Sequence, residues 1–198
     1  MEKLVITIAR QYGSGGRQIG RELAERLEIP FYGKEELMEI ARGREDYEEV
    51  RAFYEEQPVN SLLYAIAMNQ SENQVGKIPF KRIRELCGKE SCVLIGRCGN
   101  YIFREEENCI RIFIYADMKT KQDWVMKHEG LSAHRAKAKI QEIDEERAEF
   151  HKYYTGEAWG SMNYYDLCIN AGVLGTEKTV ELICSYLKSR GLRNGRKK

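Results

Sequence analysis

A glycine-rich run at residues 9–20, ARQYGSGGRQIG, carries the clearest chemistry in this chain. Glycines tolerate positive φ, so successive backbone N–H groups of such a loop can point inward and bind an anion. A helix that begins near residue 16 would add its positive end, and the arginine at position 17 would add a guanidinium suited to phosphate oxygens. We therefore expect this run to bind the phosphates of a nucleotide through Gly13, Ser14, Gly15, Gly16, Arg17 and Gln18.

The run departs from the strict P-loop pattern G-x-x-x-x-G-K-[ST] at three positions. Gln11 stands where the first glycine belongs, Arg17 where the lysine belongs, and Gln18 where the hydroxyl residue belongs. The dinucleotide pattern G-x-G-x-x-G fails as well, because it would require a glycine at position 18. A glycine-rich turn without a ligand is the alternative. The strand pattern before the run and the helix pattern after it favour phosphate binding, and the metal ligands stay unassigned.

Strand and helix patterns alternate on both sides of this loop. Short apolar runs predict strands at residues 4–9, 31–32, 92–95, 111–115 and 167–170. Helical patterns follow the glycine run, extend from about Ser132 to Tyr154, and begin again near Thr176. This alternation predicts a parallel α/β sheet with right-handed crossovers, whose ligands bind at the carboxyl ends of the strands. Residues 96–97 and 117 also follow strands, and we expect Asp117 to cap the next helix.

The composition suits one compact domain and excludes several classes of protein. The chain has 198 residues, 42% hydrophobic and 32% charged, with a formal net charge of +1. The charge argues against a nucleic-acid partner, and no apolar run is long enough to span a membrane. The six cysteines form no C-x-x-C pair, so we expect reduced core thiols in a cytoplasmic protein. The sequence leaves the oligomeric state open, a homo-oligomer included.

Four segments resemble one known family. ITIARQYGSGGRQIGRELAERLEIPFYGKEEL at residues 6–37 and VLIGRCGNYIF at 93–103 are similar to the cytidylate-kinase-like family of P-loop proteins. DEERAEFHKYYTGEAWG at 144–160 and NYYDLCINAGVLGTEKTVELI at 163–183 resemble its lid, last strand and last helix. The likeness is weak only over about residues 40–89.

The resemblance implies a three-layer α/β P-loop NTPase fold of the nucleoside-monophosphate-kinase type in a single domain, residues 1–198. A five-stranded parallel core would comprise residues 1–33, 90–130 and 165–190. A helical acceptor-binding insertion after the second strand would occupy about residues 34–89. A mobile helical lid would occupy about residues 131–160.

The resemblance also implies an activity and residue roles. The reaction would transfer the γ-phosphoryl group of ATP, with Mg²⁺, to a nucleoside monophosphate such as CMP or dCMP, or to a similar small phosphorylated acceptor. Arg17 would hold the β- and γ-phosphates. Arg97 would bind the acceptor phosphate, with Tyr32 as a second acceptor-binding residue. Arg147 and Lys152 would act as closing cations from the lid, which makes the expected catalytic set Arg17, Arg97, Arg147 and Lys152; His151 is a further candidate there.

Three points stay open at this stage. Cys98 follows Arg97 where cytidylate kinases carry an aspartate that helps to select the acceptor, so the preferred base is open. Arg147, beside the acidic run 144–146, equally fits a solvated charged helix face. The altered loop is compatible with a kinase or with a nucleotide-binding regulatory protein that does not turn over its ligand.

Overall fold

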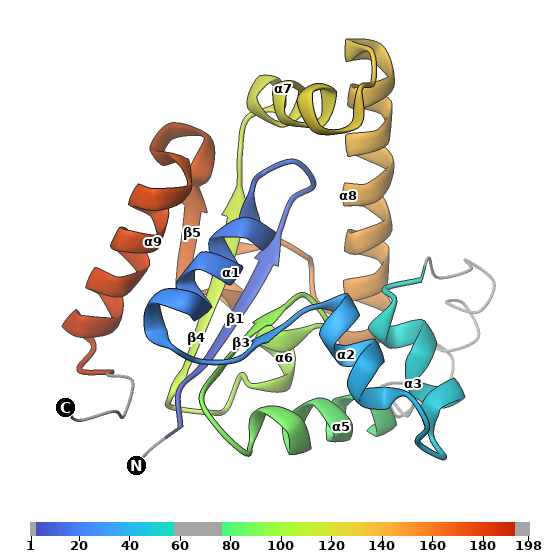
Figure 1. Ribbon diagram of the computed structural model, residues 1–198, viewed down its shortest axis with the longest axis vertical. Coiled ribbons are helices and arrows are strands. Elements are labelled where there is room, and N and C mark those ends of the chain that lie inside the picture. Colours follow the sequence, from blue (N-terminus) through green and yellow to red (C-terminus); the bar gives the residue numbers. More distant parts are fainter. Residues whose placement is uncertain (1–2, 58–76, 193–198) are drawn as a thin grey trace.

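A parallel sheet of five strands forms the centre of the molecule (Figure 1). The computed structural model describes residues 3–57 and 77–192. The sheet order is β2-β3-β1-β4-β5, and every neighbouring pair is parallel. The strands are β1 (Val5–Arg10), β2 (Phe31–Tyr32), β3 (Cys92–Ile95), β4 (Cys109–Tyr115) and β5 (Leu167–Asn170). The predicted five-stranded α/β core is therefore confirmed, with strand limits within two residues of those expected.

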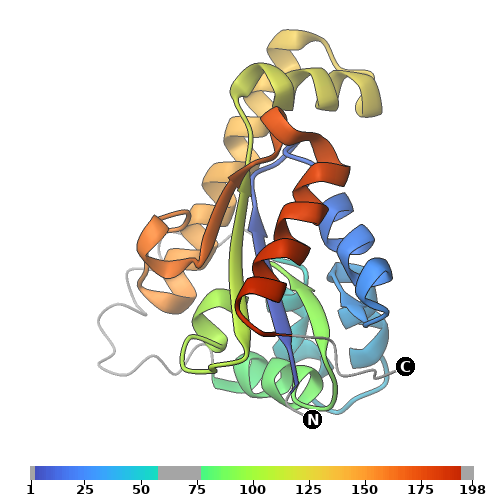
Figure 2. The same cartoon turned by 90° about the vertical axis from the view of Figure 1, so that its left-hand side faces the viewer.

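Helices cover both faces of this sheet and make three layers (Figure 2). Helices α1 (Gly16–Leu27) and α9 (Ala171–Ser189) pack on one face, where Ile6 and Ile8 of β1 meet Leu23 and Ile183. These side chains are almost fully buried. The opposite face is covered by α6 (Gly99–Ile102) and by the C-terminal part of α8 (Ala133–Thr155). Burial on both faces explains why the strands read as continuous apolar runs.

The described residues between β2 and β3 are mainly helical, as predicted. They form helices α2 (Lys34–Ala41), α3 (Tyr47–Tyr54) and α5 (Lys77–Cys87), and a short apolar stretch of the sequence at residues 62–68 falls outside the described residues. Phe53 of α3 connects this region to the rest of the molecule. Its ring contacts Phe80 of α5 at 5.6 Å and Phe150 of α8 at 5.4 Å between ring centroids. This aromatic contact places the end of α3 beside the sheet edge.

Helix α7 (Met118–Glu129) and the start of α8 project beyond the carboxyl ends of the strands (Figure 1). The Asp117 side chain accepts a hydrogen bond from the Thr120 N–H at 3.0 Å, so the predicted cap is confirmed. Ser132 caps α8 in the same way. The 3₁₀ helix η1 (Met162–Tyr164) then leads to β5. The last helix begins earlier than the expected Thr176, because a first turn from Ala171 joins it across a kink at Gly175, whose φ is 73°.

The six cysteines are free thiols. Four of them, Cys87, Cys92, Cys98 and Cys109, are buried, as predicted. The prediction is wrong for Cys168, which is exposed because β5 forms an edge of the sheet. Among the described residues, no helix combines the length and the apolar character needed to cross a membrane.

Candidate active site

The glycine loop connects β1 to α1 at the carboxyl edge of the sheet. Gly13 and Gly15 have φ values of 74° and 77°, which favour glycine. At Gly16 a Cβ atom would lie 2.5 Å from the Arg10 Cβ, so close packing requires glycine there. Within residues 3–57 and 77–192, no acceptor receives the backbone N–H groups of Gly13, Gly15, Arg17 and Gln18. The loop thus presents unpaired donors at the positive end of a 12-residue helix, as an anion site requires.

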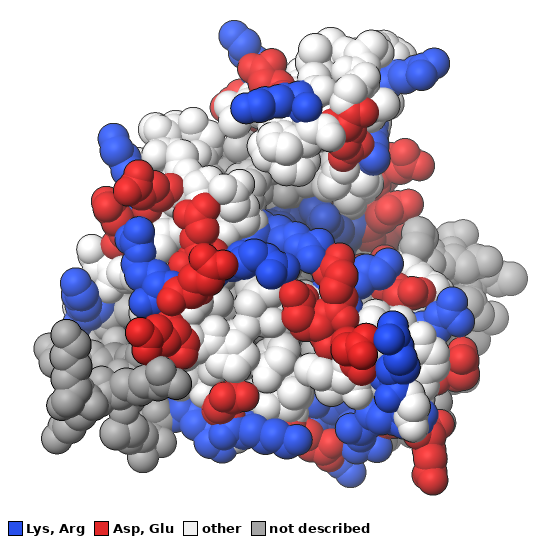
Figure 3. All heavy atoms as spheres, in the orientation of Figure 1, with Lys and Arg blue, Asp and Glu red and all other residues white. Residues whose placement is uncertain are grey.

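Arg17 stands beside this loop but its guanidinium turns to Glu35 of α2. Arg17 Nη1 donates to Glu35 Oε1 at 3.1 Å, and Nη2 also contacts that carboxylate. The hydrogen bond from Arg17 lowers the pKa of Glu35 despite the opposing effect of burial. Both side chains are about half exposed. Arg17 nevertheless lines the cavity over the loop, together with Tyr12, Arg21 and Trp124. Figure 3 shows Lys and Arg side chains in the hollow below α7.

Arg97 is buried, with 2% of its surface exposed. It follows β3 in a segment of three consecutive left-handed residues, Gly96, Arg97 and Cys98, with φ values of 69°, 53° and 53°. This backbone turns the guanidinium inward, where Nε donates to the Tyr54 carbonyl at 3.0 Å and Nη1 to the Ile95 carbonyl at 3.3 Å. Burial lowers the pKa of Arg97 although a nearby carboxylate opposes the shift. Arg97 is therefore not a surface residue but part of the buried edge of the candidate site.

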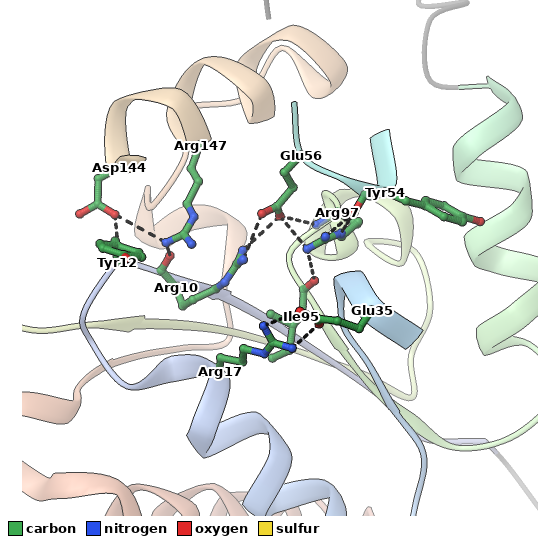
Figure 4. A network of polar contacts seen from close by, with 10 residues as sticks. All are labelled: Arg10, Tyr12, Arg17, Glu35, Tyr54, Glu56, Ile95, Arg97, Asp144 and Arg147. Carbon is green, nitrogen blue, oxygen red and sulfur yellow. Dashed lines mark hydrogen bonds and ion pairs between the residues drawn. The ribbon is translucent and has the colours of Figure 1, made fainter. Parts of the chain in front are cut away.

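Glu56 is the carboxylate that meets Arg97, and it also joins Arg97 to Arg10 (Figure 4). Arg10 Nη1 and Nη2 donate to its two oxygens at 3.1 and 3.0 Å. The backbone N–H of Arg97 donates to Glu56 Oε1 at 3.2 Å, and Arg97 Nη1 lies 3.3 Å from the same atom. Burial alone would raise the pKa of Glu56, but the charges of Arg10 and Arg97 hold it well below its usual range. Glu56 is therefore ionised at neutral pH.

Arg147 completes the cluster from α8. Its Nη1 donates to the Arg10 carbonyl at 3.1 Å and lies 3.8 Å from Asp144 Oδ1. Burial, and then the charge of Arg10, lower the pKa of Arg147 to about 9. Asp144 in turn accepts from the Tyr12 N–H at 2.6 Å and pairs with Lys121 at 3.0 Å. Arg147 thus faces the sheet edge, which excludes a solvated helix face for this residue.

Two predicted site residues lie elsewhere. Lys152 is exposed on α8 and lines neither the cavity over the loop nor the one beside the arginines. Tyr32 packs in the core beside β3, and burial, with Glu90 nearby, raises its pKa to about 12. The structure therefore does not bring Tyr32 or Lys152 to the other candidates. His151, by contrast, is buried and lines the cavity beside Arg97.

Comparison with known proteins identifies the family. The sequence profile of the cytidylate kinase-like family matches residues 5–172. The chain belongs to the cytidylate kinase-like family. An Archaeoglobus fulgidus protein named cytidylate kinase is 23% identical over 193 residues, covering 95% of this chain and 97% of its own length. These relationships confirm the family that the four sequence segments indicated.

Solved structures agree on the fold. An uncharacterised protein from Eubacterium ventriosum is 30% identical, covers 95% of this chain and 99% of its own, and superposes with a TM-score of 0.75. Shikimate kinase from Bacteroides thetaiotaomicron is 13% identical, with 93% and 98% coverage and a TM-score of 0.55. The latter is a likeness of fold alone, that of the P-loop kinases. Family and fold together support a small-molecule kinase.

Reasoning from the sequence does not indicate four further residues of the candidate site. They are Arg10, Glu56, Lys121 and Asp144. Arg10 could have been found, because it ends β1 directly before the loop, where parallel sheets bind ligands. Glu56 and Asp144 carried no such signal, since each lies among many charged residues of a helical region.

The residues present fit an ATP triphosphate better than they fit a preformed metal site. The unpaired loop amides suit phosphate oxygens. In the described part of the chain, no group of three or more His, Cys, Asp or Glu side chains could hold a metal ion. Mg²⁺ in kinases is usually held by substrate phosphates, water and only one or two carboxylates, so this finding is compatible with a nucleotide-bound ion.

Proposed function

We propose that this protein transfers the γ-phosphoryl group of ATP to a nucleoside monophosphate, CMP or dCMP, or to a similar small phosphorylated acceptor. One observation carries the proposal. A loop lined by unpaired amides occurs at the same edge of the sheet as a cluster of three arginines, of which Arg97 is buried and Arg10 and Arg147 are largely buried. Phosphoryl transfer depends mainly on positioning two anionic groups and offsetting their charge. Two adjacent anion sites are what that reaction needs.

The proposed roles follow from position. The loop amides bind the phosphates of ATP, and Arg17 joins them when its side chain leaves Glu35, an exposed partner. Arg97 and Arg147 bind the acceptor phosphate and offset charge on the transferring group. Lys152 and Tyr32 keep their predicted roles as a closing cation and an acceptor contact only if their segments move, and we assign no step to them.

The acceptor base is the finer part of the proposal. The archaeal relative named cytidylate kinase supports a cytidine nucleotide. Cys98 is buried directly after Arg97, and burial raises the pKa of its thiol well above its ordinary value. A neutral thiol is a weaker hydrogen-bond acceptor than a carboxylate, so it favours the cytosine amino group less than aspartate would. We therefore expect a broader acceptor range than a strict cytidylate kinase has.

An acceptor panel tests the proposal. Purified protein is incubated with Mg-ATP and CMP, dCMP, UMP, AMP or GMP, and ADP formation is followed. We expect ADP formation that depends on an added nucleoside monophosphate, with CMP and dCMP among the acceptors. Arg17→Ala should lower kcat by roughly 10²–10³-fold, as does loss of one donor to developing charge. Arg26→Ala, an exposed arginine in the last turn of the same helix, should keep wild-type turnover.

A second candidate is a nucleotide-binding regulatory protein without turnover. It is favoured by the engagement of Arg17 with Glu35 and by the lack of a hydroxyl at Gln18. The same experiment separates the two functions. The protein could bind ATP and yet form no more acceptor-dependent ADP than Arg17→Ala does. That result would contradict kinase activity toward the acceptors of that panel and support a regulatory function.

A further inference from the structure

The arginine cluster carries more positive charge than its own carboxylates offset. Arg10, Arg97, Arg147 and Lys121 are connected with only Glu56 and Asp144. Two positive charges of this connected network are therefore uncompensated within the described residues. Such a surplus is costly where side chains are mostly buried, because burial weakens the solvation of each cation. The lowered pKa values of Arg97 and Arg147 have the same cause.

Glu56 lies where an anion bound by this cluster would lie. Its two oxygens accept hydrogen bonds from both terminal nitrogens of Arg10 and from the backbone N–H of Arg97. The carboxylate also rests against Gly96, where a Cβ atom would collide with it and with the Arg10 guanidinium. A glycine that allows close backbone approach, a backbone N–H that points at the anion and paired guanidinium nitrogens form a cradle typical of phosphate sites.

The backbone of Glu56 shows that this contact is held at some cost. Glu56 follows the end of α3 and has a φ of 50°, in the left-handed region. For a residue other than glycine this conformation is unfavourable. The carboxylate contacts therefore hold a segment that would relax if they were released.

The cavity beside Glu56 has polar groups that the carboxylate does not reach. Thr7 Oγ1, Asn100 Nδ2 and His151 Nε2 line it, are buried, and lack a hydrogen-bond partner among the described residues. Buried polar atoms are normally paired with protein, water or ligand. The lining of this cavity thus offers more hydrogen-bonding groups than Glu56 satisfies, but its free volume is only about 20 Å³, so a larger occupant fits only once the Glu56 carboxylate has left.

We propose that Glu56 is an internal ligand of the acceptor-phosphate site, and that the acceptor's phosphate displaces its carboxylate from Arg10 and Arg97. This inference rests on the proposed function. It makes Glu56 a determinant of specificity. A monoanion would only replace one carboxylate by another, whereas a phosphate monoester carries a charge of about −1.5 to −2 at pH 7 and offsets more of the surplus. The site therefore selects phosphorylated acceptors over carboxylates.

The test measures binding of CMP and of inorganic phosphate without ATP, by titration calorimetry. Glu56→Gln removes the competing charge, so both should bind roughly tenfold tighter than to the wild type. Glu55→Gln is the matched control, because Glu55 lies one residue away and, among the described residues, its carboxylate meets Arg51, at 3.6 Å, and Gln57. Its affinities should stay within about twofold of the wild type, because the Glu55 carboxylate pairs with Arg51 and not with the arginines of the cluster. Unchanged or weaker binding of both probes to folded Glu56→Gln would overturn the proposal.

A measurement on the wild type keeps the test decisive if Glu56→Gln does not fold. Hydrogen exchange is followed with and without CMP. Displacement predicts faster exchange at residues 54–57 while the amides of the glycine loop and of residues 96–98 keep or gain protection. Slower exchange at 54–57 would show that Glu56 stays in place and would overturn the proposal.

These outcomes are separable from those of the acceptor panel. Kinase activity with unchanged phosphate affinity in Glu56→Gln would refute the role of Glu56 and leave the proposed function standing. Tighter phosphate binding in that variant without turnover would support Glu56 as the internal ligand and contradict the kinase.

Discussion

Two arginine–glutamate pairs at the same edge of the sheet differ in almost every physical respect. Arg17 and Glu35 join α1 to α2 with side chains 49% and 60% exposed. Arg10 and Glu56 join β1 to the end of α3 with side chains 12% and 14% exposed. Water screens the first pair, so breaking it costs little. The second pair is largely removed from water, so each charge depends on the other.

The difference in exposure suits the two arginine–glutamate pairs to different roles in ligand binding. A side chain that is free to leave its partner can follow a nucleotide as it binds, and Arg17 is such a residue. A buried ionic network holds its geometry until a stronger ligand enters, and Arg10, Arg97 and Glu56 form such a network. The exposed pair is thus suited to follow a nucleotide as it binds, and the buried network to distinguish one anionic ligand from another.

The largest expected effect contrasts Arg97→Ala with Arg17→Ala in stability. Arg97→Ala should lower the free energy of unfolding by about 3–5 kcal/mol, because it removes one partner of a buried ionic network. Arg17→Ala should lower it by less than about 1 kcal/mol, since its ion pair is exposed. Urea denaturation at pH 7 measures both. Equal losses in the two variants would remove the distinction between the regions.

The buried region should also dominate the acid sensitivity of the protein. Burial lowers the pKa of His151 to about 4 from its ordinary 6.5. The unfolded chain therefore takes up a proton before the folded one does, and stability falls as the pH drops from about 6.5 to about 4, by up to roughly 3 kcal/mol. His151→Gln should flatten this part of the stability profile, measured by urea denaturation at several pH values. A variant with the wild-type slope would show that other groups cause it.

A second acid transition should follow at lower pH. The pKa of Glu56 is lowered in the folded protein, so its stabilisation is present above the unfolded value of about 4.5 and is lost as the pH falls further. Glu56→Gln should lack this loss, whereas Glu55→Gln should retain it. The comparison uses the same titration, extended below pH 4.5.

The glycine loop allows a finer contrast. Gly13→Ala and Gly15→Ala both place a side chain at positive φ, which costs about 1–2 kcal/mol. Gly13→Ala should cost more, because its Cβ would lie 2.9 Å from the Lys121 carbonyl oxygen, whereas nothing lies within 4 Å of a Cβ at Gly15. Thermal unfolding ranks the two variants. A larger loss in Gly15→Ala would show that the loop adjusts at Gly13.

The smallest expected effect belongs to Arg17→Lys. Because the pair with Glu35 is exposed, the free energy of unfolding should change by less than about 0.5 kcal/mol. Lysine retains the charge and matches the usual P-loop residue, so ATP binding should persist. Calorimetric titration with ATP checks the second expectation, with Arg17→Ala as the variant that loses affinity.

Most of the fold was predictable because its signals are local. Continuous apolar runs marked the strands, and the caps at Asp117 and Ser132 are short-range hydrogen bonds. The start of α9 was placed too late, since the kink at Gly175 separates a first turn that has no apolar periodicity of its own. Cys168 was wrongly placed in the core, because a strand run does not reveal that its strand lies at an edge.

The candidate site was predictable only in part. Arg17 and Arg97 stand out in the sequence because each directly follows a glycine, Arg17 at the start of a helix and Arg97 at the end of a strand. The roles of Tyr32 and Lys152 were inferred from the resemblance alone. In the structure Tyr32 packs in the core and Lys152 is exposed to solvent. Glu56 was not found at all.

The sequence by itself determined the order of strands and helices along the chain, the glycine loop and the basic residues beside it, because these depend on contacts within a few residues. Only the tertiary structure decided which charges meet. Glu56 reaches Arg10 across 46 positions and Arg97 across 41, and Arg147 reaches Arg10 across 137. The energy of such contacts depends on how far folding removes them from water, and that depends on the packing of the whole molecule.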